Sequence, residues 1–136
     1  FVRQHDPDFI DGDTISVLDN NNVMLPGENA KSRVLIKNVV TDETKVAFEG
    51  TKERPFFTYV MGKHQWLPNG NLLISESTEG RALEINPKGE TVWEFNNLVD
   101  QGWVAIMEEV ERLPKEYDEA FFVNARARCE AEHKHK

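Results

Sequence analysis

The chain has 136 residues, of which 39% are apolar and 29% charged, a composition typical of one globular domain and not of a disordered chain. Its net charge of −8, with 16 Lys and Arg residues scattered among 24 Asp and Glu residues, argues against nucleic acid as a partner, because phosphate binding needs a basic stripe. No run approaches the roughly 18–20 apolar residues of a membrane-spanning helix, and the single cysteine, Cys129, has no partner for an internal disulfide.

The first 50 residues predict four short strands joined by turns. Apolar residues alternate in runs bounded by Gly, Asn, Asp and Pro, which places the strands at about 6–10, 14–19, 33–37 and 44–49. Gly12 is expected to supply the positive φ of the tight turn between the first two strands. A longer loop over residues 20–31 precedes the third strand, and loops that expand in one repeat typically face a functional rim.

Residues 51–97 repeat this plan more compactly, with strands at about 57–62 or slightly beyond, 71–76, 81–85 and 91–95. In both units a histidine precedes the first hairpin and an arginine opens a later strand: His5 and Arg33 in the first, His64 and Arg81 in the second. Self-similar units of short strands are typical of propeller blades. The predicted fold class is therefore all-β, a partial β-propeller of about two four-stranded antiparallel blades with a C-terminal strand and α-helix.

The repeat stops after residue 97. Residues 103–112 alternate and predict one more strand. Pro114 is expected to open an amphipathic helix, because residues with an apolar side recur after it at three- and four-residue spacing: Tyr117, Phe121, Phe122, Ala125 and Cys129. The histidines of the terminal His133-Lys134-His135-Lys136 are interpreted as part of a frayed polar tail. The chain is thus divided into one blade over 1–50, a second over 51–97, and a closing strand and helix over 98–136.

Two blades do not make a closed structure, because they leave strand edges and apolar faces uncovered. We therefore expect either further propeller blades upstream of this segment or a homo-oligomer that closes the ring. The chain opens at Phe1, without a methionine and already inside a repeat, which indicates the C-terminal portion of a longer protein.

The two repeated histidines are the leading candidates for chemistry. The innermost strands of a propeller line its central channel, so equivalent positions in successive blades converge on the axis. The spacing from histidine to turn glycine is seven residues for His5 and six for His64. A one-residue slip turns one imidazole away unless a bulge absorbs it, and a partly buried structural role stays open for each histidine.

Arg33 and Arg81 each open a strand directly after a loop. An arginine fork binds an oxyanion such as sulfate, phosphate or carboxylate through two parallel hydrogen bonds. The alternative is an ion pair with a nearby Asp or Glu, which contributes little at a surface.

Two acidic pairs lie near the first turn: Asp6 with Asp8, and Asp11 with Asp13. Their spacing could suggest calcium, but the proline and glycine of this stretch explain it equally well, and no loop carries a full oxygen-ligand array. No metal site is therefore predicted. The sequence also lacks a Walker loop, a Gly-x-Ser-x-Gly elbow and a zincin motif, which removes several common enzyme classes.

Both units resemble the arylsulfotransferase family. In the first unit the resemblance rests on Gln4-His5-Asp6, Gly12-Asp13-Thr14-Ile15-Ser16-Val17-Leu18-Asp19-Asn20 and, after the loop, Ser32-Arg33-Val34-Leu35. In the second it rests on His64-Gln65-Trp66-Leu67-Pro68-Asn69-Gly70-Asn71-Leu72-Leu73-Ile74, Gly80-Arg81-Ala82-Leu83-Glu84-Ile85 and Val92-Trp93-Glu94-Phe95. Together these stretches span residues 4–96, and residues 111–117 are similar in kind to the C-terminal closure of that family.

The resemblance implies a six-bladed propeller that transfers a sulfuryl group from an aryl sulfate donor to a phenolic acceptor, with no cofactor and through a transiently sulfated histidine. It implies His5 as the nucleophile, Arg33 as the oxyanion-binding arginine and His64 as a second channel histidine that could exchange roles with His5. Asn20 and Arg81 are candidate substrate-binding residues. The resemblance also implies a periplasmic or secreted location and further channel histidines in upstream blades, so it stays open whether this segment is active alone.

The chemistry of these residue types agrees with that assignment. Imidazole titrates near neutrality, so a useful fraction of it is an unprotonated nucleophile at pH 7, and a covalent intermediate divides one transfer into two easier steps. Sulfuryl transfer resembles phosphoryl transfer in needing in-line positioning and cations on the equatorial oxygens. Asp6 follows His5 directly on a strand, so its carboxylate is expected to point to the other face rather than to orient that imidazole.

Two other functions stay open. A non-catalytic β-propeller that binds a ligand or a protein through its rim would use His5 and His64 structurally, because one fold hosts many functions. A hydrolase or lyase on the same scaffold would need a metal or paired acids in the channel.

Overall fold

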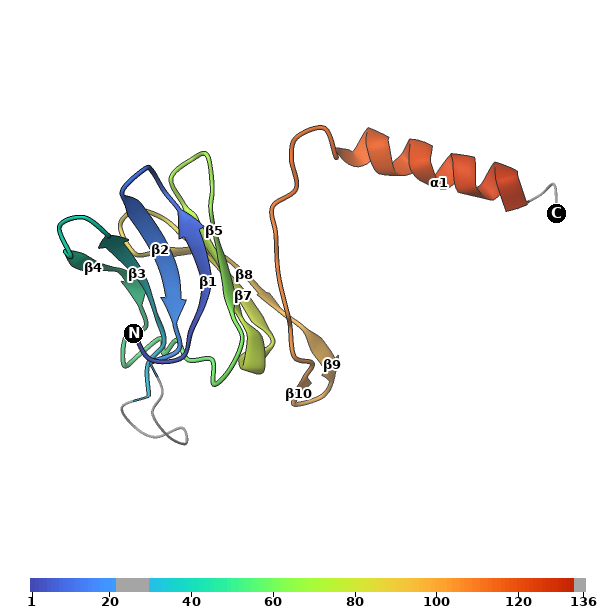
Figure 1. Ribbon diagram of the computed structural model, residues 1–136. Coiled ribbons are helices and arrows are strands. Elements are labelled where there is room, and N and C mark those ends of the chain that lie inside the picture. Colours follow the sequence, from blue (N-terminus) through green and yellow to red (C-terminus); the bar gives the residue numbers. More distant parts are fainter. Residues whose placement is uncertain (22–29, 134–136) are drawn as a thin grey trace.

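The structure is a computed structural model that describes residues 1–21 and 30–133 (Figure 1). The described part is mostly β, with two four-stranded antiparallel sheets and a two-stranded one, followed by a helix, which confirms the predicted fold class. The first sheet holds β1 (Gln4–Phe9), β2 (Thr14–Asp19), β3 (Arg33–Asn38) and β4 (Thr44–Glu49). The second holds β5 (Lys63–Trp66), β6 (Leu72–Glu76), β7 (Arg81–Ile85) and β8 (Thr91–Asn96), with a short 3₁₀ turn, η1 (Ser77–Glu79), after β6.

Each larger sheet is a simple meander in which sequence neighbours are also sheet neighbours. The two sheets lie beside each other (Figure 1), and apolar side chains from both meet in one core. Its members are Leu18 and Val34 from the first sheet, Leu72, Ile74, Leu83 and Ile85 from the second, and Phe56 from the connecting segment. Burying each such side chain stabilises the fold by about 1.5–3 kcal/mol. This core therefore fixes the two sheets relative to each other.

The first strand of the second sheet, predicted at about 57–62 or slightly beyond, begins at Lys63. Residues 57–62 form no strand, because three of their backbone N–H groups donate to side chains instead. These bonds run from Phe57 to Glu76 Oε1 (2.6 Å), from Thr58 to Ser32 Oγ (2.9 Å) and from Tyr59 to Thr78 Oγ1 (3.1 Å). Side chains that come from three other segments compete here with strand pairing, and the local sequence pattern does not reveal them.

The turn between β1 and β2 also differs from its prediction, because Gly12 does not take a positive φ. Asp11 Oδ1 accepts the Asp13 backbone N–H at 3.0 Å, and Ile10 donates its N–H to the Thr14 carbonyl at 2.9 Å. The chain is thus reversed by an Asx turn, in which the aspartate side chain accepts a backbone N–H. Such a turn does not need the positive φ that glycine adopts without strain.

After β8 the chain forms a small hairpin of β9 (Leu98–Asp100) and β10 (Trp103–Val104). Only two residues of the predicted strand over 103–112 are in a sheet. The following stretch, residues 105–118, is called the return segment here because it runs back along the second sheet (Figure 1). Gln65 and Arg112 fasten it there, with the Arg112 backbone N–H donating to Gln65 Oε1 at 2.8 Å and Gln65 Nε2 donating to the Arg112 carbonyl at 3.3 Å.

The helix α1 (Glu119–His133) starts five residues after Pro114. It extends away from the sheets (Figure 1), so the expected apolar stripe is largely uncovered: Phe121 and Phe122 are 39% and 50% exposed, and Phe121 contacts the ring of Tyr117 with centroids 4.9 Å apart. In the described part of the chain this helix lacks the length and apolar character needed to cross a membrane. Of the tail predicted over 133–136, His133 ends α1, whereas residues 134–136 and most of the loop over 20–31 lie outside the described residues.

Candidate functional site

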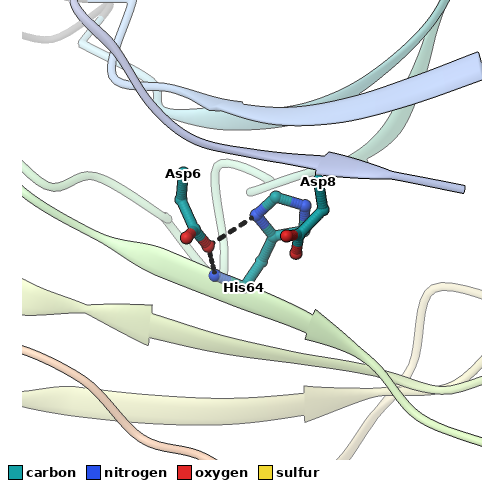
Figure 2. Close-up of side chains that lie close together, drawn as sticks. All are labelled: Asp6, Asp8 and His64. Carbon is teal, nitrogen blue, oxygen red and sulfur yellow. Dashed lines mark hydrogen bonds and ion pairs between the residues drawn. The ribbon is translucent and has the colours of Figure 1, made fainter.

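The strand β1 is distorted where it lies beside β5. His5 pairs with Leu18 and Asp8 pairs with Ser16, so β1 contains one residue more than β2 over this interval. Asp6, inside this bulge, has φ of 55°, a left-handed conformation that few residues other than Gly and Asn adopt. The distortion lets the Asp6 carboxylate point to β5 (Figure 2).

His64 is the buried centre of the seam between the sheets. Its side chain has no exposed area, and its Nε2 lies 2.7 Å from Ser16 Oγ on the opposite sheet. Its Nδ1 lies 3.1 Å from Asp6 Oδ2, the same oxygen that accepts the His64 backbone N–H at 2.6 Å. Trp66 Nε1 also donates to Ser16 Oγ, at 3.0 Å. One polar network thus joins the two sheets through this imidazole.

Asp6 carries the negative charge of the network. Burial by itself would raise the pKa of the Asp6 carboxyl, but hydrogen bonds from His64 and the nearby charges of His64 and Lys63 outweigh it, so the pKa is lowered. Asp6 is therefore ionised at neutral pH. The imidazole that this carboxylate contacts is that of His64, on the other sheet.

His5 is the exposed member of the pair. It lines a shallow hollow together with Asp6, Met61, Gly62, Lys63 and Glu108. The Lys63 ammonium in this hollow lies 3.1 Å from a Glu109 oxygen and 4.0 Å from an Asp6 oxygen. Among its lining residues the hollow therefore combines an exposed imidazole with a lysine and two carboxylate side chains.

The two histidines do not occupy equivalent places. His5 lies opposite Leu18 and His64 lies opposite Ile74, and these two apolar residues enter the same core from different sheets. Directly opposed residues in neighbouring strands lie on the same face of their sheet. His5 therefore lies on the face of the first sheet that is turned to the second sheet, and His64 lies on the face of the second sheet that is turned to the first. Equivalent positions in two repeated sheets would instead lie on the same face of each sheet. The one-residue difference between the spacings of His5 and His64 from their turn glycines is consistent with the different faces that the two histidines occupy.

Arg33 and Arg81 are each bonded to a buried carboxylate of their own sheet. Arg33 Nε and Nη2 both donate to Asp19 Oδ2, at 3.1 and 3.0 Å. Arg81 Nε donates to Glu76 Oε2 at 2.5 Å, and its Nη2 donates to the Pro55 carbonyl at 2.7 Å. Neither arginine is among the residues that line the hollow at His5. These contacts match the ion-pair alternative that the sequence leaves open.

Asn20 is fully buried and connects the end of β2 to the segment before β5. Its Nδ2 donates to the Thr58 carbonyl at 2.8 Å and to the Met61 carbonyl at 3.0 Å. It therefore holds the backbone next to the hollow, since Met61 lines that hollow.

The set of site residues predicted from the sequence lacks Asp6, Asp8 and Ser16, which lie next to the His64 ring. Ser16 is completely buried and bonds His64, and Asp8 brings a third ligand-type atom near that imidazole. Ser16 sits in an apolar run and carries no local signal, whereas Asp6 and Asp8 form an acidic pair whose spacing is explained equally well by the proline between them. Only the packing of one sheet against the other brings them to His64.

Comparison with known proteins identifies the family. A family model described as arylsulfotransferase (ASST) matches residues 1–98, which include both four-stranded sheets. No curated protein and no solved structure gives a significant match. Because the matched region spans most of the chain, this chain belongs to the arylsulfotransferase family.

Proposed function

We propose that this chain supplies two blades of an arylsulfotransferase propeller and that His5 is the nucleophile that accepts the sulfuryl group. Membership of the family supports the class of reaction, with an aryl sulfate as donor and a phenol as acceptor. The observation that carries the choice of residue is burial. The His5 side chain is exposed in a hollow, whereas the His64 ring is enclosed and has a polar partner at each nitrogen.

The proposed reaction has two transfers. A lone pair of the His5 imidazole forms an N–S bond to the donor sulfur as the bond from sulfur to the phenolic oxygen breaks, and the donor leaves as a phenolate that takes up a proton. The acceptor phenol then loses its proton, its oxygen forms a new S–O bond and the N–S bond breaks, which regenerates the imidazole. Both steps need cations near the sulfuryl oxygens, as phosphoryl transfers do.

Lys63 is the cation that the hollow itself offers for that purpose. Arg33 remains the proposed oxyanion-binding arginine on the family motif, and its contact with Asp19 uses only two of its five N–H donors. Asn20 and Arg81 are proposed as substrate-binding residues on the same motif. Their described partners are backbone carbonyls and Glu76, so a substrate role requires these side chains to exchange partners.

The test is turnover of a chromogenic aryl sulfate with a phenol acceptor by the full-length protein. We expect His5→Ala to lower kcat/KM by about 10³-fold or more, because removal of a nucleophile abolishes the covalent route. Asp13→Asn, an exposed substitution on the adjacent turn, is the matched control and should leave turnover unchanged. Rapid quenching followed by peptide mass analysis should locate the sulfuryl group on the peptide that contains His5.

Unchanged turnover in His5→Ala would remove this residue as nucleophile. Sulfation of His64 instead would exchange the roles of the two histidines. A full-length protein that binds aryl sulfates but shows neither turnover nor sulfation would favour the non-catalytic binding module.

A further inference from the structure

We propose that Asp6, Asp8 and His64 form a binding site for a divalent metal ion at the seam between the two sheets. One ligand-type atom from each of the three side chains lies within 4.8 Å of the other two (Figure 2). The Nδ1 of His64 and Oδ2 of Asp6 are 3.1 Å apart, a separation that fits two ligands of one ion at about 2.0–2.2 Å each. This inference does not depend on the proposed sulfuryl transfer.

The buried imidazole distinguishes this site from a simple cluster of acidic side chains. His64 Nδ1 is enclosed, and none of the described residues makes an aligned hydrogen bond to it, although Asp6 Oδ2 lies at ion-pair distance. Trp66 Nε1, which is only a donor, already donates to Ser16 Oγ. Without an ion, His64 Nδ1 can carry the proton and donate it to Asp6. With an ion bound, the ring proton lies on Nε2 and is donated to Ser16 Oγ, which leaves the Nδ1 lone pair directed at the ion. A lone pair beside two carboxylates is favourable only with a cation between them.

This arrangement matches the outer shell of known metal sites. Metal-bound histidines commonly donate their second ring N–H to a fixed acceptor, which sets the tautomer and the direction of the ring. Ser16 is completely buried and is the residue in that position. The bulge in β1 and the left-handed φ of Asp6 position its carboxylate beside the Nδ1 atom of the imidazole.

The ligand set selects a class of ion. One imidazole nitrogen with two carboxylates suits Mn²⁺, Zn²⁺ or another first-row transition metal, whereas Ca²⁺ and Mg²⁺ prefer oxygen ligands alone. Asp8 is exposed, so the third ligand faces solvent and leaves the ion a path of entry and open coordination positions. An ion bound here would join β1 of one sheet to β5 of the other.

The experiment measures Mn²⁺ binding to the full chain by calorimetry and by the paramagnetic resonance signal of free Mn²⁺. All measurements use a background with His133→Asn and His135→Asn, so that the tail histidines cannot bind the ion. We expect one Mn²⁺ per chain and a binding constant that falls at least about tenfold in Asp8→Asn. Asp8 is exposed, so this variant should keep its fold, and Asp13→Asn should bind Mn²⁺ as the background does.

Proton resonances of the imidazoles locate the ion independently of affinity. Bound Mn²⁺ should broaden the ring signals of His64 at substoichiometric amounts, and substitution of Asp8 should abolish that broadening. Equal Mn²⁺ affinity in Asp8→Asn and Asp13→Asn would overturn the proposal. The proposal would also be overturned if the His64 ring carries its proton on Nδ1 and its signals do not respond to Mn²⁺. In that case Ser16, His64 and Asp6 form a hydrogen-bonded network without an ion.

Discussion

Each four-stranded sheet is fastened at the same point by an arginine bonded to a buried carboxylate. Asp19 ends β2 and faces Arg33, and Glu76 ends β6 and faces Arg81. A buried ion pair loses the hydration of both charges, and other interactions must compensate for that loss. The carboxylates therefore also accept backbone N–H groups, as Glu76 does from Phe57 at 2.6 Å.

For Glu76, these contacts do not fully offset the cost of removing a charged carboxylate from water. Burial raises the pKa of its carboxyl, and the hydrogen bonds from Arg81 and Phe57 offset that effect only in part. The folded protein thus binds this proton more tightly than the unfolded chain does. The contribution of Glu76 to stability is complete below the ordinary pKa near 4.5 and is lost as pH rises through the raised value.

We predict that the difference in unfolding free energy, wild type minus Glu76→Gln, falls as pH rises from below 4.5 towards neutrality. Glutamine keeps the hydrogen-bonding oxygen but does not titrate. Urea unfolding at several pH values measures the difference, and Glu116→Gln is the control because Glu116 is exposed and is not among the groups that shift the pKa of Glu76. A difference that stays flat or rises with pH would contradict the assignment.

At the scale of elements, the return segment is fitted to the second sheet at Gly80. This residue follows η1 with φ of 57°, and a Cβ placed on it would lie 2.3 Å from the Ala105 carbonyl oxygen. The Gly80 carbonyl also accepts the Asn97 N–H at 2.8 Å. The end of the 3₁₀ turn and the start of the return segment are therefore packed backbone against backbone.

We predict that Gly80→Ala lowers the unfolding free energy by more than about 1 kcal/mol, because the new methyl group meets backbone and the φ is unfavourable. Gly12→Ala is the matched control. Gly12 has no positive φ and nothing within 4 Å of its added Cβ, so that variant should be neutral or gain up to about 1 kcal/mol. Thermal and chemical unfolding compare them, and equal effects of the two substitutions would contradict the close approach at Gly80.

At the scale of the whole molecule, β8 and the hairpin that follows it expose a group of apolar side chains. Trp93 and Phe95 of β8 stack with ring centroids 6.3 Å apart and are 44% and 47% exposed. Leu98, Val99 and Trp103 of the neighbouring hairpin are exposed by about two thirds or more. Contiguous exposed apolar surface of this kind marks a contact with further protein.

We predict that the isolated chain associates with increasing concentration and that Trp93→Thr with Phe95→Thr suppresses this association. Val39→Thr with Val40→Thr is the control, because those exposed valines lie in the turn between β3 and β4, on the other sheet. Sedimentation velocity over a range of concentrations measures the mass. A chain that stays monomeric throughout would show that this surface is tolerated without a partner.

The sequence by itself determined most of the strands, the β-rich class and the family. The bounds of β2, β4 and β7 follow from alternation between strong turn residues, which is a local property. Tertiary structure decided which histidine is exposed, where Asp6 points and that Ser16 and Asp8 join His64. Those outcomes depend on a one-residue bulge in β1 and on how one sheet packs against the other, and neither is encoded in the alternation of a single strand.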